Sequence, residues 1–200
     1  MRKALLSILL TTVLLSGCAS AEMTWGEIKS DLQGRTAIVE TFDEGSQLID
    51  HIEGVSIDMG AENKFNTVDS EGNVTSKSGV LSITVGGKSM VHVGSSLIMK
   101  EQGLEDRFRE FATTVDISNL DPSTPIVDRM VNSMKNSFTG QSMLILVRSQ
   151  SGMPLAAFAG NKVSYFSTDI DKSTAFLVDG KYLFIYRCDY TIYDMSLIMK

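Results

Sequence analysis

The residue with the clearest chemistry in this sequence is Cys18, which ends the tetrapeptide Leu15-Ser16-Gly17-Cys18. Arg2 and Lys3 precede an apolar run of twelve residues, Ala4–Leu15, which is shorter than the ~20 residues that span a bilayer. Small residues before a cysteine fit the cleavage site of a signal peptidase, and the thiol carries a diacylglycerol thioether. The pattern predicts a signal peptide over residues 1–17 and a lipid anchor on Cys18. The alternative is an ordinary signal peptide followed by an incidental cysteine.

The chain has two cysteines, so lipidation of Cys18 would leave Cys188 as the one free thiol. Strand alternation from Tyr182 to Tyr193 places the following side chains on one face: Tyr182, Phe184, Tyr186, Cys188, Tyr190 and Ile192. A cysteine among aromatic residues on a core face acts as a small hydrophobe rather than a nucleophile. The aromatic residues, with Tyr193, form either a core face, which is favoured, or an open platform for stacking a sugar or glycan.

Other residues with chemical potential lack the rest of their motifs. Gly87-Lys88-Ser89 follows a strand but precedes strand-like residues, so the helix N-terminus that would cradle a phosphate is missing. Asp69–Asn73 has the alternating oxygen ligands of a calcium loop, but its glycine is at the wrong position. His51 and His92 are the two histidines; His51 shares a strand face with Glu53 and has no adjacent nucleophile. We therefore expect no metal and no cofactor, and no catalytic residue is identified.

The charge of the chain excludes one class of partner. Without residues 1–17, which hold two of the 18 basic residues, 16 basic residues face 24 acidic ones, a net charge of −8. Nucleic-acid binding needs a basic surface, so a nucleic-acid partner is not expected. Adhesion to anionic lipid is disfavoured for the same reason, and attachment to a membrane must come from the lipid on Cys18.

Two periodicities divide the chain into helical and strand segments. Thr24 and Glu27 form a capping box for a short helix that ends near Gly34. Helical spacing recurs over 104–111, with an expected Glu105–Arg109 ion pair, and over 124–138, where Pro125 begins an amphipathic helix. Strands are predicted in these ranges: 36–42, 47–59, 79–85, 89–93, 96–100, 143–147, 155–158, 162–167, 175–178 and 181–193. The range 143–147 is apolar on both faces, as a central strand would be, whereas period-two alternation begins at Arg35.

The strand-rich stretches resemble each other. Ser96–Lys100 recurs identically as Ser196–Lys200, and Val85-Gly86-Gly87-Lys88 corresponds to Val178-Asp179-Gly180-Lys181. This order predicts two similar β units, 35–100 and 142–200, joined by a helical connector over 101–141. The alternative is that hairpin-rich sequences look alike. The predicted class is a mainly β (α+β) domain over 35–200. Its antiparallel sheets would carry one packed amphipathic helix, after an anchor, tether and short helix over 18–34.

Several of these segments together resemble an uncharacterised lipoprotein family of Gram-positive bacteria. The resemblance rests on the lipobox, the opening over 24–34, the Gly87-Lys88 strand motif ending near Glu101, and Asp179–Cys188. It implies no activity, no cofactor and no catalytic residue.

The sequence thus predicts a membrane-anchored lipoprotein on the extracytoplasmic face, acting as a binding or structural module of the cell envelope. Its partner would be an envelope glycan or a protein. The alternative function is an envelope hydrolase that uses carboxylates as acid and base, which a pocket of convergent Asp or Glu side chains would favour.

Overall fold

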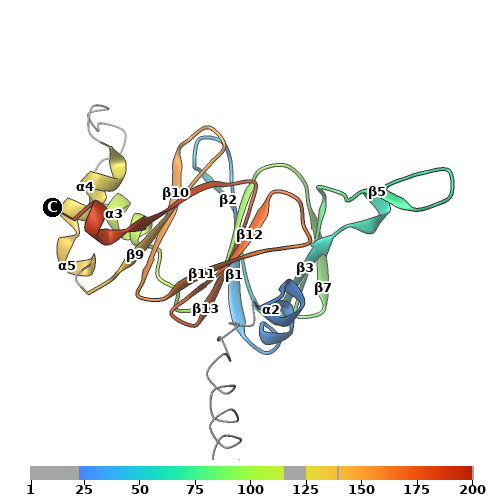
Figure 1. Ribbon diagram of the computed structural model, residues 1–200, viewed down its shortest axis with the longest axis horizontal. Helices are drawn as coiled ribbons and strands as arrows, with labels where there is room; N and C mark the ends of the chain where they lie inside the picture. Colours follow the sequence, from blue (N-terminus) through green and yellow to red (C-terminus); the bar gives the residue numbers. More distant parts are fainter. Residues whose placement is uncertain (1–22, 115–124, 139, 200) are drawn as a thin grey trace, which may run out of the picture.

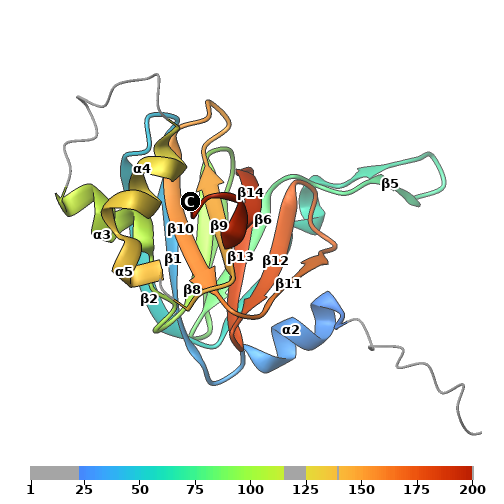
Figure 2. The same ribbon diagram turned by 60° about the vertical axis from the view of Figure 1, so that its left-hand side comes forward.

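A six-stranded antiparallel sheet forms the middle of the computed structural model, which describes residues 23–114, 125–138 and 140–199 (Figures 1 and 2). Its strand order is β11-β12-β13-β8-β1-β2. The strands are β1 (Thr36–Phe42), β2 (Leu48–Val55), β8 (Ser96–Glu101), β11 (Val163–Ser167), β12 (Ser173–Val178) and β13 (Lys181–Tyr186). Apolar side chains alternate to both faces of β8 and β13, which explains why this sheet is covered on both sides.

A three-stranded sheet packs on each face of the central sheet. One has the order β3-β6-β7 and consists of β3 (Ile57–Ala61), β6 (Leu81–Val85) and β7 (Lys88–His92). The other has the order β10-β9-β14 and consists of β9 (Met143–Arg148), β10 (Pro154–Gly160) and β14 (Asp189–Asp194). The mainly β class with antiparallel sheets is confirmed.

The predicted N-terminal helix is α2 (Trp25–Asp31), and its capping box is confirmed. The Glu27 amide donates to the Thr24 hydroxyl at 3.3 Å, and the Thr24 amide donates to the Glu27 carboxylate at 2.6 Å. Trp25 is buried and stacks on Phe184 of β13 at 5.2 Å between ring centroids. This contact fixes α2 to the same side of the central sheet as β3-β6-β7.

Three short helices cover the outer face of the β10-β9-β14 sheet (Figure 2). They are α3 (Arg107–Thr114), α4 (Ile126–Ser133) and α5 (Lys135–Phe138), so the single helix expected over 124–138 is wrong. The helix breaks at Met134, where Ser133 Oγ donates to the Met130 carbonyl, a bond that competes with the backbone ladder. Thr124, the first residue of that expected range, lies outside the described residues, and Pro125 is the N-cap of α4 rather than its first helical residue.

The residues between β3 and β6 form an arm that extends from the body beyond β3 (Figure 1). The arm contains the short helix η1 (Asn63–Phe65) and the hairpin β4 (Thr67–Val68) and β5 (Val74–Ser76). Gly72 turns the hairpin at φ 85°.

The single strand expected over 181–193 is also wrong. Arg187 adopts φ 51° and separates β13 from β14, which belong to different sheets. The Ser96 hydroxyl donates to the Arg187 carbonyl and holds the break. A further short helix, η3 (Met195–Leu197), follows β14.

The strand pairing of residues 36–101 recurs in residues 142–194. The orders β2-β1-β8 and β3-β6-β7 in the first stretch match β10-β9-β14 and β11-β12-β13 in the second. The registers match as well. In the pair β3–β6, Ile57 faces Val85, and in the corresponding pair β11–β12, Val163 faces Val178. The hairpins β1–β2 and β9–β10 share an irregularity in which one residue of the second strand is skipped.

The identical pentapeptide does not mark equivalent positions in this pairing. Ser96–Lys100 lies in β8, whereas Ser196–Leu197 lies in η3. The strand that matches β8 is β14, since Phe42 faces Ser96 as Arg148 faces Asp189. The pentapeptide is therefore displaced by seven residues from the register that the hydrogen bonds define.

Candidate functional site

The buried charged groups of the described residues gather around Glu40 of β1, whose side chain is 2% exposed. Lys100 of β8 places Nζ 3.4 Å from Glu40 Oε2, and His51 of β2 places Nδ1 2.8 Å from Glu40 Oε1. Antiparallel pairing brings these side chains together. Glu40 faces His51 across β1 and β2, and Lys100 on β8 faces Ile38, which lies two residues before Glu40 on the same face of β1.

Helix α3 adds an arginine to this cluster. Arg109 Nη2 donates to Glu40 Oε1 at 2.9 Å, so the predicted Glu105–Arg109 pair is wrong, and Glu105 pairs instead with Arg107 at 2.7 Å. Asp106 accepts from the amides of Phe108 at 3.0 Å and Ala157 at 2.9 Å. These bonds cap α3 and tie its first turn to β10.

The two carboxylates in this cluster have opposite pKa shifts. Burial acts to raise the pKa of Glu40, but hydrogen bonds from Arg109 and His51 and the charge of Lys100 outweigh it, so the pKa is lowered. Burial raises the pKa of Asp106 against its hydrogen bond from Ala157. A general acid and a general base that act together need pKa values shifted in opposite directions. Both carboxylates are nevertheless occupied by protein donors, and the arrangement serves to hold α3 on the sheet.

The predicted relation between His51 and Glu53 is not formed. His51 contacts Glu40, while Glu53 accepts from Gln102 Nε2 at 3.3 Å. The second histidine, His92, is buried, and its Nε2 lies 3.0 Å from the Ser95 carbonyl oxygen. Its ring packs edge-on against Tyr186. No group of three potential metal ligands occurs among the described residues.

The four tyrosines do not share one open face. Tyr182 and Tyr186 on β13 are buried, and their hydroxyls donate to Asp31 at 2.7 Å and to the Gly79 carbonyl, respectively. Tyr190 and Tyr193 lie on β14 in a different sheet, where Tyr190 is exposed and packs edge-on against Phe176. An aromatic platform made of all four side chains is therefore absent, because the break at Arg187 separates the two pairs.

Cys188 lies between these strands, with its Sγ 3.3 Å from the Tyr186 carbonyl. Burial raises the pKa of its thiol to about 12. A thiol of this pKa carries little thiolate at neutral pH and is a poor nucleophile.

We expect Cys188 to react with iodoacetamide at least about tenfold more slowly in the native protein than in urea at pH 8, because burial raises the pKa of its thiol. The measurement uses the Cys18→Ser variant, in which Cys188 is the one remaining cysteine. Equal rates in native and unfolded protein would contradict the burial of this thiol.

The remaining weak motifs are turns and strands. Lys88 begins β7 directly after the Gly86-Gly87 turn, so no helix follows it. Asp69 accepts from the amides of Glu71 at 2.9 Å and Asn73 at 2.8 Å, which uses its carboxylate to hold the hairpin turn of the arm.

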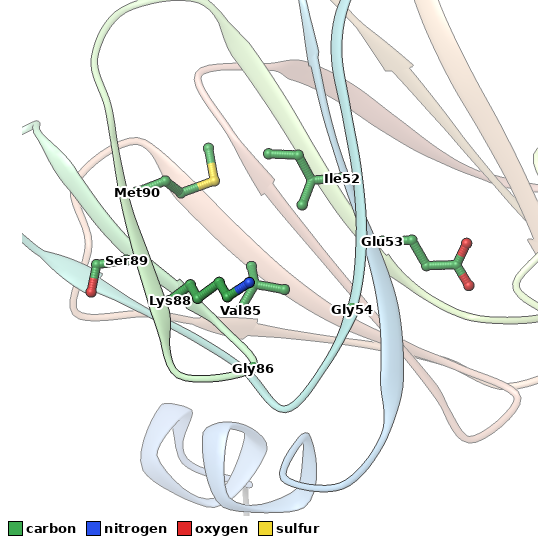
Figure 3. Close-up of a pocket in the computed structure, with 8 residues that line it drawn as sticks. All are labelled: Ile52, Glu53, Gly54, Val85, Gly86, Lys88, Ser89 and Met90. Carbon is green, nitrogen blue, oxygen red and sulfur yellow. The ribbon is translucent and has the colours of Figure 1, made fainter.

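An open apolar groove lies between β2 and β7 (Figure 3). Its volume is ≈ 400 Å³, and its lining residues are Ile52, Glu53, Gly54, Val85, Gly86, Lys88, Ser89 and Met90. Figure 3 shows Ile52 and Met90 on opposite sides of it, with Lys88 reaching towards Val85. In the part of the chain that the structure describes, β2 and β7 are terminal strands of their sheets, so open strand edges flank this groove. The groove is closed at one end, where the Gly86 amide donates to the Val55 carbonyl at 3.0 Å.

Comparison with known protein families gives a match over nearly the whole chain. A family model described as Domain of unknown function (DUF5052) matches residues 2–198. No curated protein and no solved structure matches the chain. Within the described residues, every helix is too short or too polar to cross a membrane.

Proposed function

The chain belongs to the DUF5052 family of domains of unknown function, and we propose that it is a lipid-anchored binding module on the extracytoplasmic face of the cell envelope. The lipid on Cys18 attaches it to the membrane. The groove between β2 and β7 binds an extended segment of a protein partner. The observation that carries this proposal is the coincidence of an apolar groove with two strand edges that are open among the described residues.

A protein segment suits this groove better than a glycan does. Strand addition at an open edge pairs the backbone of the ligand, while the adjacent groove takes its apolar side chains. Glycan stacking needs exposed aromatic rings, and none of the eight lining residues is aromatic.

The anchor places this groove close to the membrane. Seven peptide bonds separate Cys18 from Trp25, and a fully extended chain of that length reaches about 25 Å. Trp25 is fixed in the core by its stacking on Phe184. The folded domain would then stay near the bilayer although its negative charge gives it no attraction to anionic lipid.

We expect cells to incorporate radiolabelled palmitate into the wild-type chain and not into the Cys18→Ser variant, because the thiol is the point of acylation. Cys188→Ser is the matched control and should label as the wild type does. Equal labelling of Cys18→Ser and wild type would refute the anchor.

We also infer that residues 36–101 and 142–194 are two copies of one β unit. The matching registers support this, and so does a shared close contact. A Cβ on Gly54 would lie 2.2 Å from Val85 Cγ1, and one on Gly160 would lie 2.7 Å from Val178 Cγ1. The following turns, Gly86-Gly87 and Asp179-Gly180, have positive φ at both residues. The arm over 62–80 is the main difference, since β11 and β12 are joined by a short loop.

The second candidate function is a hydrolase that uses the carboxylates of the cluster around Glu40. The opposite pKa shifts of Glu40 and Asp106 favour it, together with an open hollow of ≈ 590 Å³ lined by Lys100, Asp106 and Arg109. Hydrolysis of purified peptidoglycan that is lost in Asp106→Asn and retained in Glu53→Gln would support this function. Because protein donors already occupy both carboxylates, binding is the better-supported function.

A further inference from the structure

The second β unit contains a counterpart of the open groove, and there the chain itself fills it. Residues Ala159, Val178, Asp179 and Lys181 correspond to Glu53, Val85, Gly86 and Lys88 in the matched registers. The space left between them is only ≈ 210 Å³, because the segment that follows β8 enters it with Leu104, which is 8% exposed.

The strand edge beside that counterpart groove is also occupied. β8 of the first unit pairs with β13 of the second, with Leu183 facing Lys100 and Tyr186 facing Leu97. One segment, β8 with Leu104, therefore provides both a paired strand and an apolar plug for the second unit.

The first unit lacks both of these contacts. β7 corresponds to β13, and it is the terminal strand of its sheet, with no partner on its outer edge among the described residues. Val93, directly after β7, is 67% exposed, and Val91 within β7 is exposed as well. The apolar groove beside this edge is open (Figure 3).

The segment of the second unit that corresponds to β8 and Leu104 makes neither of these contacts among the described residues. β14 corresponds to β8 and is the terminal strand of the β10-β9-β14 sheet. The Met195 amide donates to the Ser142 carbonyl at 2.9 Å, as the Gln102 amide donates to the Thr36 carbonyl at 2.9 Å. Leu197 follows β14 at the position at which Leu104 follows β8, yet it is 68% exposed.

We propose that β14 and Leu197 of one molecule dock on β7 and the groove of a second copy of this chain. The inference rests on the proposed binding groove and names its partner. In the register of β8 on β13, Met90 faces Tyr193 and Val93 faces Tyr190 of the other molecule. Leu197 then enters the groove beside Val85 as Leu104 enters the space beside Val178.

This docking is head-to-tail. Each molecule offers β14 at one end and β7 at the other, so the contact repeats until it closes into a ring or extends as a filament. Docking satisfies the open edges of both strands and removes exposed apolar side chains from water. Anchoring the copies to one membrane would raise their effective concentration.

The register is tested by mixing two single-cysteine variants of the full chain in detergent, Val93→Cys and Tyr190→Cys, each built on a chain in which Cys18 and Cys188 are replaced by serine. Residues that face each other across antiparallel strands lie within disulfide range. We expect a disulfide-linked dimer in the mixture and in neither variant alone. Val74→Cys mixed with Tyr190→Cys is the control and should give no such dimer, since Val74 is also exposed but lies on the arm.

The plug is tested by light scattering. The mass of the wild-type chain should rise with concentration, and Leu197→Asp should abolish this rise. Leu197 is exposed in the single molecule, so the substitution leaves folding intact. Val74→Asp, at a residue that is 54% exposed, introduces the same charge elsewhere and should associate like the wild type. A wild-type chain that stays monomeric, or association that survives Leu197→Asp, overturns the proposal.

A photoreactive residue in place of Lys88, which lines the groove, separates this inference from the proposed function. In cells, a cross-linked product of twice the chain's own mass and composed of this chain supports docking of a second copy. A product with a different protein overturns the self-docking and leaves a binding groove. No product at all contradicts both.

Discussion

Glu40→Ala is expected to lower the free energy of unfolding by about 3–5 kcal/mol, because it leaves buried Lys100 without its counter-charge. Arg109 and His51 lose their acceptor at the same time, and the contact that fixes α3 to the sheet is removed. Urea denaturation followed by circular dichroism measures the effect.

Glu53→Ala is the matched control, since Glu53 is an exposed carboxylate on the neighbouring strand β2. It should change stability by about 0.5 kcal/mol or less. A double variant, Glu40→Leu with Lys100→Met, should recover much of the loss, because a well-packed apolar pair can replace a buried ion pair. A cost below about 1 kcal/mol for Glu40→Ala would contradict the role of this cluster.

Comparison of the wild type with Glu40→Ala isolates the contribution of Glu40 to the pH dependence of stability. The pKa of Glu40 is lowered on folding, so its contribution is present above the unfolded-state pKa and is lost as the pH falls through the folded-state pKa. The pKa of Asp106 is raised, so its contribution has the opposite sign and is lost as the pH rises. The difference in the free energy of unfolding between wild type and Glu40→Ala should therefore shrink as the pH falls. Asp106 is present in both proteins, so its contribution cancels in this difference.

Phe184→Ala should lower the free energy of unfolding by about 3–5 kcal/mol, because the ring is fully buried in the central sheet. The substitution leaves a cavity beneath Trp25, whose indole stacks on Phe184 at 5.2 Å, and should loosen α2 from the sheet. Chemical denaturation gives the stability, and tryptophan fluorescence reports on the loosening because Trp25 is the one tryptophan.

Phe65→Ala is the control for Phe184→Ala, because the Phe65 ring on η1 is 62% exposed. It should leave stability within about 0.5 kcal/mol of the wild type and leave the fluorescence of Trp25 unchanged. Similar costs for the two substitutions would contradict the described core.

Local chemistry determined what the sequence predicted correctly. The Thr24–Glu27 capping box involves neighbours three residues apart, and the turns at Gly86-Gly87 and Asp179-Gly180 depend on residues that tolerate positive φ. The apolar alternation in β1 and the continuous apolar run in β9 were likewise sufficient to predict strands in a mainly β fold. The lipobox at Cys18 is a short motif of the same kind, and the lipid it predicts stays a prediction.

Tertiary structure decided where similar local sequences would lie. Alternation predicted one strand over 181–193, but Tyr186 and Tyr190 belong to different sheets, because the sheets on either side of Arg187 each bury their own apolar face. The cluster around Glu40 joins residues up to 69 positions apart, which no spacing in the sequence reveals. Leu104 and Leu197 follow equivalent strands, yet the first is buried and the second exposed. The physical reason is that a partner strand and groove lie beside Leu104 within the same chain and are missing beside Leu197 in the described part of the molecule.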